Sequence, residues 1–164
     1  MSLLTAELLA NVGRTASYVA PEELGRASLR YFARAVGDDD LRVTDPDAAR
    51  AAGFRDVVAP PTFVCETNQY LDGRADDEGY IGHSWGIEIP GTRLLRGGHE
   101  YELFEPVHPD VVLHVTWRIE DITARTSSQG TELIVVTSTA EYADQHGTLL
   151  ARNRETLLYQ ELPS

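Results

Sequence analysis

The chain has 164 residues, a length that suits one domain with a buried core of its own. Its composition, 42% hydrophobic and 24% charged, is ordinary for a globular protein, and it has no run of about 18 apolar residues that would cross a membrane. The formal net charge of -12 argues against nucleic acids and anionic membranes as partners. The first residues lack the order of a signal peptide, so we expect a cytoplasmic protein.

The first half of the chain has mainly helical patterns. Helices are predicted at residues 4–12, 24–36, shortly after Pro46 and at 61–71, with a first strand at 14–20. The helix over 24–36 is expected to end at Gly37, because glycine readily adopts the left-handed conformation that closes a helix.

Three carboxylates, Asp38, Asp39 and Asp40, follow Gly37. One interpretation is that they are solvated and cap the turn that begins the next element. The other is that Asp38 points into a pocket and handles protons there. Both interpretations stay open at the level of the sequence.

Residues 72–84 contain three glycines and read as a loop over whatever lies below. We expect His83, within this loop, to be solvated rather than to act as a base. One cysteine, Cys65, excludes an internal disulfide and is expected to be a small buried side chain. The histidines lack the spacing of a metal site and no nucleotide-binding glycine motif occurs, so we predict no metal and no cofactor.

The second half of the chain is rich in strands, predicted at residues 94–104, 111–119, 131–142 and 148–159. Residues 111–119 alternate between apolar and polar side chains, as a half-buried strand does. Gly97 and Gly98 predict a bulge or a close backbone approach, and His99 follows them on what we expect to be a central strand. Tight connections between consecutive strands predict an antiparallel meander, and the pattern alone indicates an α+β fold.

Residues 31–63, YFARAVGDDDLRVTDPDAARAAGFRDVVAPPTF, resemble the hydratase signature of the MaoC-like, (R)-specific enoyl-CoA hydratases and hydroxyacyl dehydratases. Gly37-Asp38 match its G-D, and Ala59 matches the start of its A-H-G element. The chain is more similar still to the FAS1-like dehydratase N-terminal branch, including the non-catalytic subunits of heteromeric (3R)-hydroxyacyl dehydratases. The resemblance implies a single hot-dog domain over residues 1–164, an antiparallel sheet wrapped around a central helix that begins after Pro61.

The departures from this signature concern its chemistry. The catalytic family pairs an aspartate with a histidine, whereas the histidine position here is Val43, which cannot transfer a proton. The glycine of A-H-G, whose N–H polarises the thioester carbonyl, is replaced by Pro61, which has no N–H. The resemblance implies Asp38 as a catalytic remnant. It implies substrate contacts from Tyr31, Val43, Ala59, Pro60, Pro61, Gly97, Gly98 and His99.

These observations favour an acyl-thioester-binding subunit of an (R)-specific enoyl-thioester hydratase or (3R)-hydroxyacyl dehydratase without a complete dyad of its own. Its ligand would be an acyl-CoA or acyl-carrier-protein thioester. A homodimer, or a heterodimer with a MaoC-like catalytic subunit, would cover the sheet edges and complete the pocket. The alternatives are a stand-alone hydratase or thioesterase with Asp38 or Glu66 as base, and a non-catalytic protein that binds acyl ligands.

Overall fold

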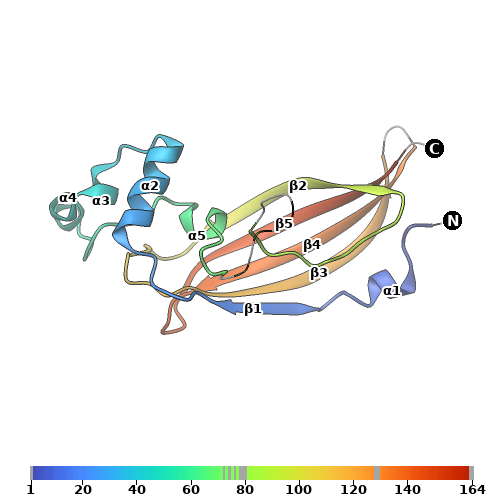
Figure 1. The fold of residues 1–164 in the computed structure, drawn as a ribbon, viewed down its shortest axis with the longest axis horizontal. Coiled ribbons are helices and arrows are strands. Elements are labelled where there is room, and N and C mark those ends of the chain that lie inside the picture. Colours follow the sequence, from blue (N-terminus) through green and yellow to red (C-terminus); the bar gives the residue numbers. More distant parts are fainter. Residues whose placement is uncertain are drawn as a thin grey trace.

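The structure, a computed structural model, describes residues 2–71, 73, 75, 77, 81–127 and 130–162. Its main element is a five-stranded antiparallel sheet with the strand order β1-β3-β4-β5-β2 (Figure 1). The meander expected for the second half of the chain is confirmed, because β3 pairs with β4 and β4 with β5. The strands are β1 (Thr15–Val19), β2 (Thr92–Leu103), β3 (His114–Thr126), β4 (Glu132–Ala143) and β5 (Leu149–Glu161).

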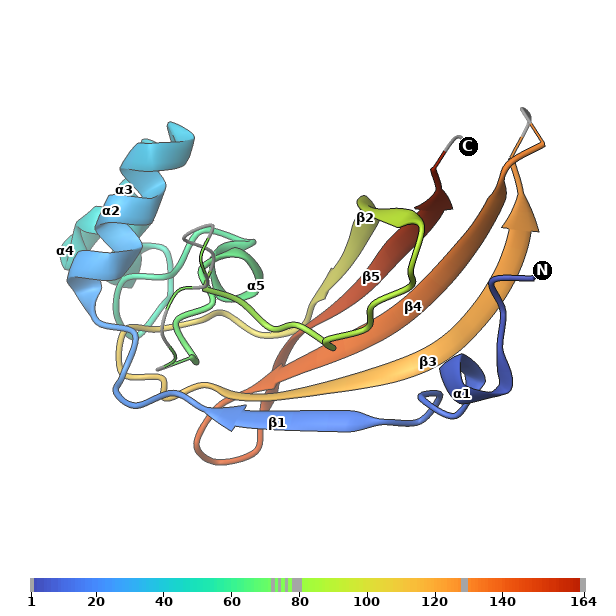
Figure 2. The same cartoon turned by 45° about the vertical axis from the view of Figure 1, so that its right-hand side comes forward.

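The helices are short and lie in two places. The helices are α1 (Ala6–Leu9), α2 (Arg26–Val36), α3 (Leu41–Thr44), α4 (Pro46–Ala51) and α5 (Phe63–Glu66). Helices α2, α3 and α4 lie together beyond one end of the sheet, whereas α5 lies on its concave side, as Figure 2 shows. None of the helices in the described part of the chain is long and apolar enough to span a membrane.

The residues between α2 and α4 form caps, as the acidic turn suggested. Gly37 ends α2 in the left-handed conformation, with φ of 74°. The carboxylate of Asp40 accepts a hydrogen bond from the backbone N–H of Arg42 and begins α3, a helix that the sequence pattern did not predict. Asp45 caps α4 in the same way, and Pro46 occupies its first turn, where a proline costs no hydrogen bond. The helix expected after Pro46 is therefore confirmed.

Helix α5, on the concave side, is shorter than the helix predicted over residues 61–71. It is a single turn, and the chain leaves the helical conformation at Asn68, which has a positive φ of 49°. Asparagine tolerates this conformation better than most residues, and its side-chain oxygen accepts a hydrogen bond from the hydroxyl of Tyr70 at 3.1 Å. Phe63 and Tyr70, each 1% exposed, fill the hollow of the sheet where a longer helix was expected.

Alternation along the central strands builds the core. On β3 the alternating buried side chains are Val115, Trp117 and Ile119, which confirms the period-two prediction. The strand begins at His114 and continues to Thr126, and after a register shift beyond Ile119 it also buries Ile122. Between the two edges of the sheet, β4 and β5 contribute the rest of this buried face. Their buried side chains include Ile134, Val136, Ser138, Ala140, Tyr142, Ala151, Asn153, Glu155 and Tyr159.

Strand β2 lies at an edge of the sheet, so the prediction of a central strand around His99 is wrong. It pairs only with β5, which follows β4 in the meander and occupies the position beside it. The predicted bulge is confirmed, because the register with β5 shifts between Arg96 and Gly98. At Gly97 an added Cβ would lie 3.0 Å from the carbonyl oxygen of Thr156, so the backbones approach too closely for a side chain.

The prediction of a solvated His83 is also wrong. Its ring stacks on Trp117 at a centroid distance of 4.7 Å and meets Trp85 edge-on at 4.4 Å. Its Nδ1 lies 2.8 Å from the hydroxyl oxygen of Tyr18. Burial, assisted by the nearby charge of Arg14, lowers the pKa of His83 to about 4, so the imidazole is neutral at pH 7.

Replacing Gly97 by alanine is expected to lower the free energy of unfolding by about 1–3 kcal/mol, because the new methyl group is forced against the Thr156 backbone. Urea denaturation of the variant measures this loss. The matched control is Glu100→Ala, an exposed position on the same strand, where little change is expected. Equal stability of the two variants would show that the bulge tolerates a side chain.

The buried imidazole of His83 predicts a pH-dependent stability. The folded pKa of about 4 lies below the unfolded value of about 6.5, so this contribution is complete above pH 6.5 and is lost as the pH falls toward 4. With partial exposure taken into account, the loss is about 1–2 kcal/mol. The test is the free energy of unfolding between these pH values for the wild type and His83→Phe. The difference between the two proteins should shrink as the pH falls, whereas His146→Gln, at an exposed turn, should follow the wild type.

Candidate functional site

A cavity of about 290 Å³ lies between the helical end of the chain and the ends of β2 and β5. We call it the motif pocket, because five of the predicted site residues line it: Asp38, Val43, Ala59, Pro60 and Pro61. Its other walls are mainly apolar, as a pocket for an acyl chain requires. They include Phe54, Val64, Leu103, Phe104, Val107 and Leu150.

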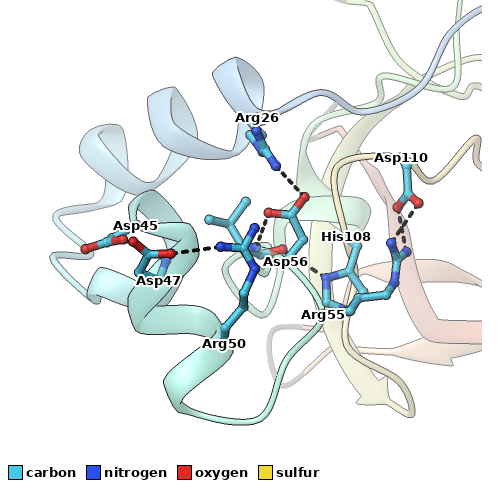
Figure 3. A network of polar contacts seen from close by, with 9 residues as sticks. Arg26, Asp45, Asp47, Arg50, Arg55, Asp56, His108 and Asp110 are labelled. Carbon is cyan, nitrogen blue, oxygen red and sulfur yellow. Dashed lines mark hydrogen bonds and ion pairs between the residues drawn. The ribbon is translucent and has the colours of Figure 1, made fainter.

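The loop between α4 and Ala59 is held in place by polar contacts at both sides (Figure 3). The Arg26 guanidinium on α2 pairs with Asp56 at 2.7 Å, and this contact holds the pKa of Asp56 below its usual range. The buried ring of His108 donates a hydrogen bond from Nδ1 to the Val57 carbonyl at 3.0 Å. These contacts join α2 and the segment before β3 to the loop, and they thereby fix the wall that Ala59 belongs to.

Asp38 provides a carboxylate in the motif pocket, whose described lining has no imidazole to pair with it. Its side chain is half-buried, and Oδ1 accepts a hydrogen bond from the Asp40 backbone N–H at 3.0 Å. Arg42, the cation of this pocket, pairs with Asp40. No histidine, cysteine or tyrosine is found among the described residues that line the pocket. Val43, 4% exposed, packs into the core where the catalytic family has its histidine.

Four of the predicted substrate contacts lie elsewhere: Tyr31, Gly97, Gly98 and His99. Tyr31 is 62% exposed on α2, with the guanidinium of Arg30 5.4 Å from its ring centroid, and it does not line the motif pocket. Gly97 and Gly98 form the bulge of β2 and are likewise outside it. The structure thus brings the residues of the hydratase-like stretch together but leaves Tyr31 and the two glycines apart from them.

His99 belongs to a second cavity of about 300 Å³, which we call the polar pocket. Its Nδ1 lies 3.2 Å from the side-chain oxygen of Asn153, so the ring is oriented with Nε2 toward Glu155, 3.9 Å away. The Arg96 guanidinium is 3.0 Å from the same carboxylate. Among the residues that the structure describes, its lining is Cys65, Glu66, Asn68, His83, Arg96, His99, Trp117, Asn153 and Glu155.

Sequence reasoning missed Asn153 and Glu155. Both point inward from β5, between the buried Ala151 and Tyr159, at positions where the strand pattern calls for apolar side chains. The break in this alternation was the available signal. Burial raises the pKa of Glu155, although Arg96 and His99 act in the opposite direction.

Cys65 and Glu66 on α5 also face the polar pocket. Burial raises the pKa of the Cys65 thiol to about 12, which makes it an unreactive core side chain, as the sequence indicated. Glu66, a candidate base, accepts a hydrogen bond from the Tyr101 hydroxyl. Burial, followed by this contact, raises the pKa of Tyr101. Within the described ranges, no three histidine, cysteine, aspartate or glutamate side chains gather as metal ligands would.

The sequence matches a known family over most of its length. The model of the FAS1-like, dehydratase domain region matches residues 10–153. A UPF0336 protein of Streptomyces avermitilis is 37% identical over 111 residues, which are 68% of this chain and 70% of that protein. A UPF0336 protein of Parafrankia sp. is 31% identical over 147 residues, 90% of each chain.

Solved structures with low sequence identity share the fold. The ChsH1-ChsH2 complex from Mycobacterium tuberculosis contains a chain that matches with a TM-score of 0.71 at 15% identity, over 97% of this chain and 94% of that one. The MaoC-like dehydratase from Rhodospirillum rubrum matches with a TM-score of 0.65 at 23% identity, over 98% of this chain and 99% of that one. A chain of the HadBC (3R)-hydroxyacyl-ACP dehydratase complex from M. tuberculosis matches with a TM-score of 0.61 at 22% identity, over 88% of this chain and 96% of that one. The chain thus belongs to the FAS1-like dehydratase-region family and has the hot-dog fold of the MaoC-like dehydratases.

Proposed function

We propose that this chain is an acyl-thioester-binding subunit of an (R)-specific enoyl-thioester hydratase or (3R)-hydroxyacyl dehydratase, and that a second MaoC-like chain supplies the proton-transfer pair. The observation that supports this most strongly is the composition of the motif pocket. It keeps apolar walls and the carboxylate of Asp38, but its described lining contains no imidazole. The ligand would be a CoA or acyl-carrier-protein thioester.

The chemistry explains why this pocket is incomplete. Addition of water to an enoyl thioester needs one group that takes a proton from water and one that gives a proton to the α-carbon. Asp38 can serve as one of these groups, but Val43 cannot serve as the other. Pro61 has no N–H to stabilise the developing charge on the thioester oxygen. The apolar walls can still bind the acyl chain, so binding and chemistry are separable in this pocket.

The unpaired edge of the sheet supports the proposal that a partner chain binds. Strand β2 has twelve residues and pairs on one side only, with β5. Leu94 is 55% exposed and Leu103 is 49% exposed on this strand. A long exposed edge with apolar side chains invites pairing with another strand unless it is covered. The ChsH1-ChsH2 and HadBC proteins are complexes of different chains, and we propose that a MaoC-like subunit covers β2 of this chain.

The catalytic test compares the chain alone with a mixture that contains a MaoC-like chain from the same genome with an intact D-x-N-P-x-H sequence. We expect no hydration of crotonyl-CoA by this chain alone and clear turnover by the mixture. Asp38→Asn should change kcat by less than about threefold, because the reacting protons move on partner side chains, whereas the Asp→Asn change in the partner's motif should lower kcat by about 100-fold or more.

Turnover by the isolated chain that Asp38→Asn abolishes would contradict this proposal. Such a result would identify a stand-alone enzyme in which Asp38 acts as the base.

The edge of β2 gives a second prediction. Replacing both Leu94 and Leu95 by lysine places two charges on the unpaired strand, so association should weaken by at least about tenfold. Sedimentation equilibrium of the wild type and the variant, with and without the MaoC-like chain, measures this change. Val12→Lys, an equally apolar and exposed position outside the sheet, is the control. If the double variant associates as tightly as the control, β2 is not the interface.

A further inference from the structure

The motif pocket and the polar pocket lie one after the other along β2 and β5. Moving along β2 and β5, side chains on the concave face change from apolar to polar. Helix α5 follows the same order, since Val64 lines the motif pocket and Glu66 the polar pocket. The directly opposed residues of the two strands are, in order, Leu103 and Ala151, Tyr101 and Asn153, and His99 and Glu155.

Tyr101 lies at the junction of the two pockets. It follows the motif-pocket residue Leu103 and precedes the polar-pocket residue His99 on the inward face of β2, and its hydroxyl donates to Glu66 of α5. From Leu103 to His99 the strand advances by four residues, about 13 Å. An acyl chain that enters through the motif pocket and passes Tyr101 would therefore meet polar groups at its far end.

These polar groups are costly for the fold. Asn153 is 1% exposed and Glu155 is 7% exposed, on a face of β5 that otherwise buries apolar side chains. Burial of an amide or a carboxylate is unfavourable unless it is compensated by hydrogen bonds or ion pairs, and here His99 and Arg96 provide them. Apolar residues would give a simpler core, and polar groups that break the local pattern tend to mark functional sites.

The groups in the polar pocket select the chemistry of a ligand. The charged groups of the pocket already have partners: Arg96 pairs with Glu155, and Glu66 accepts a hydrogen bond from Tyr101. A charged group on the ligand would therefore lose its hydration without gaining a free counter-charge. A hydroxyl group carries no charge and both donates and accepts hydrogen bonds, which suits the mixture of carboxylate, amide and imidazole groups. In addition, Nε2 of His83 is buried and has no hydrogen-bond partner within the described ranges, and His83 lines this pocket.

We propose that the polar pocket receives the distal end of the acyl chain and gives this protein a preference for acyl thioesters that carry a hydroxyl group beyond an apolar segment. The inference rests on the proposed function, because it assumes that an acyl thioester enters through the motif pocket. It assigns Asn153, Glu155 and His99 to substrate specificity rather than to catalysis.

The test measures binding of the full chain to matched ligands by calorimetry. The ligands are decanoyl-CoA, ω-hydroxydecanoyl-CoA and the corresponding pairs with shorter and longer chains. For at least one pair the hydroxylated member should bind at least about fivefold tighter, the effect of one additional hydrogen bond. In Asn153→Leu and in His99→Ala this ratio should fall to about one.

Glu102→Gln, on the outer face of β2 beside Arg152, is the matched control and should keep the wild-type ratio. Thermal unfolding shows whether each variant is folded. If Asn153→Leu does not fold, His99→Ala, on the partly exposed edge strand, provides the test. Equal affinity for both members of every pair overturns this inference and leaves the proposed function intact. If the chain binds no acyl-CoA at all, the proposed function fails and this inference fails with it.

Discussion

The curved sheet must cover its concave face, and this requirement shapes the rest of the protein. A four-residue helix is too short to cover five strands, so individual side chains from the segment around α5 complete the core. Tyr70 is one of them: it receives a hydrogen bond from the indole N–H of Trp117 on β3 and donates one to Asn68. Because the cover is a set of side chains rather than a continuous helix, cavities persist on both sides of α5.

The two cavities differ because different parts of the chain build them. Apolar ends of β2 and β5, closed by the helical segment, form the motif pocket. The polar pocket lies farther along the same strands, where Asn153 and Glu155 replace core residues. An ion pair such as Arg96–Glu155, with one partner buried, adds little net stability, because desolvation offsets most of the attraction. Its presence is therefore explained better by recognition than by folding.

Periodicity and end signals predicted much of the fold. Alternation in residues 111–119 indicated a strand, Gly37 the end of α2, and Gly97 a bulge, because each depends on local backbone preferences. Local signals could not place β2 at the edge of the sheet, since strand order depends on long-range pairing. Nor could they show the contact between His83 and Trp117, which joins a loop to a strand distant in the sequence. Of the candidate site, the contiguous hydratase-like stretch was predicted as a unit, whereas the polar pocket combines residues from five separate segments.

The packing around Val43 explains why the missing dyad is a property of the whole pocket rather than of one residue. Val43 is buried, and its backbone N–H donates to the carbonyl of Asp40, whose own N–H donates to the carboxylate of Asp38, so the two positions belong to one hydrogen-bonded turn. A histidine there would place a larger, polar ring against the apolar wall of the motif pocket, where desolvation disfavours its charged form. Pro61 in turn removes the N–H that would complete the chemistry. Valine and proline at these two positions supply apolar walls in place of an imidazole and a backbone N–H, and this is the composition that the proposed function, binding a substrate for a partner chain, requires.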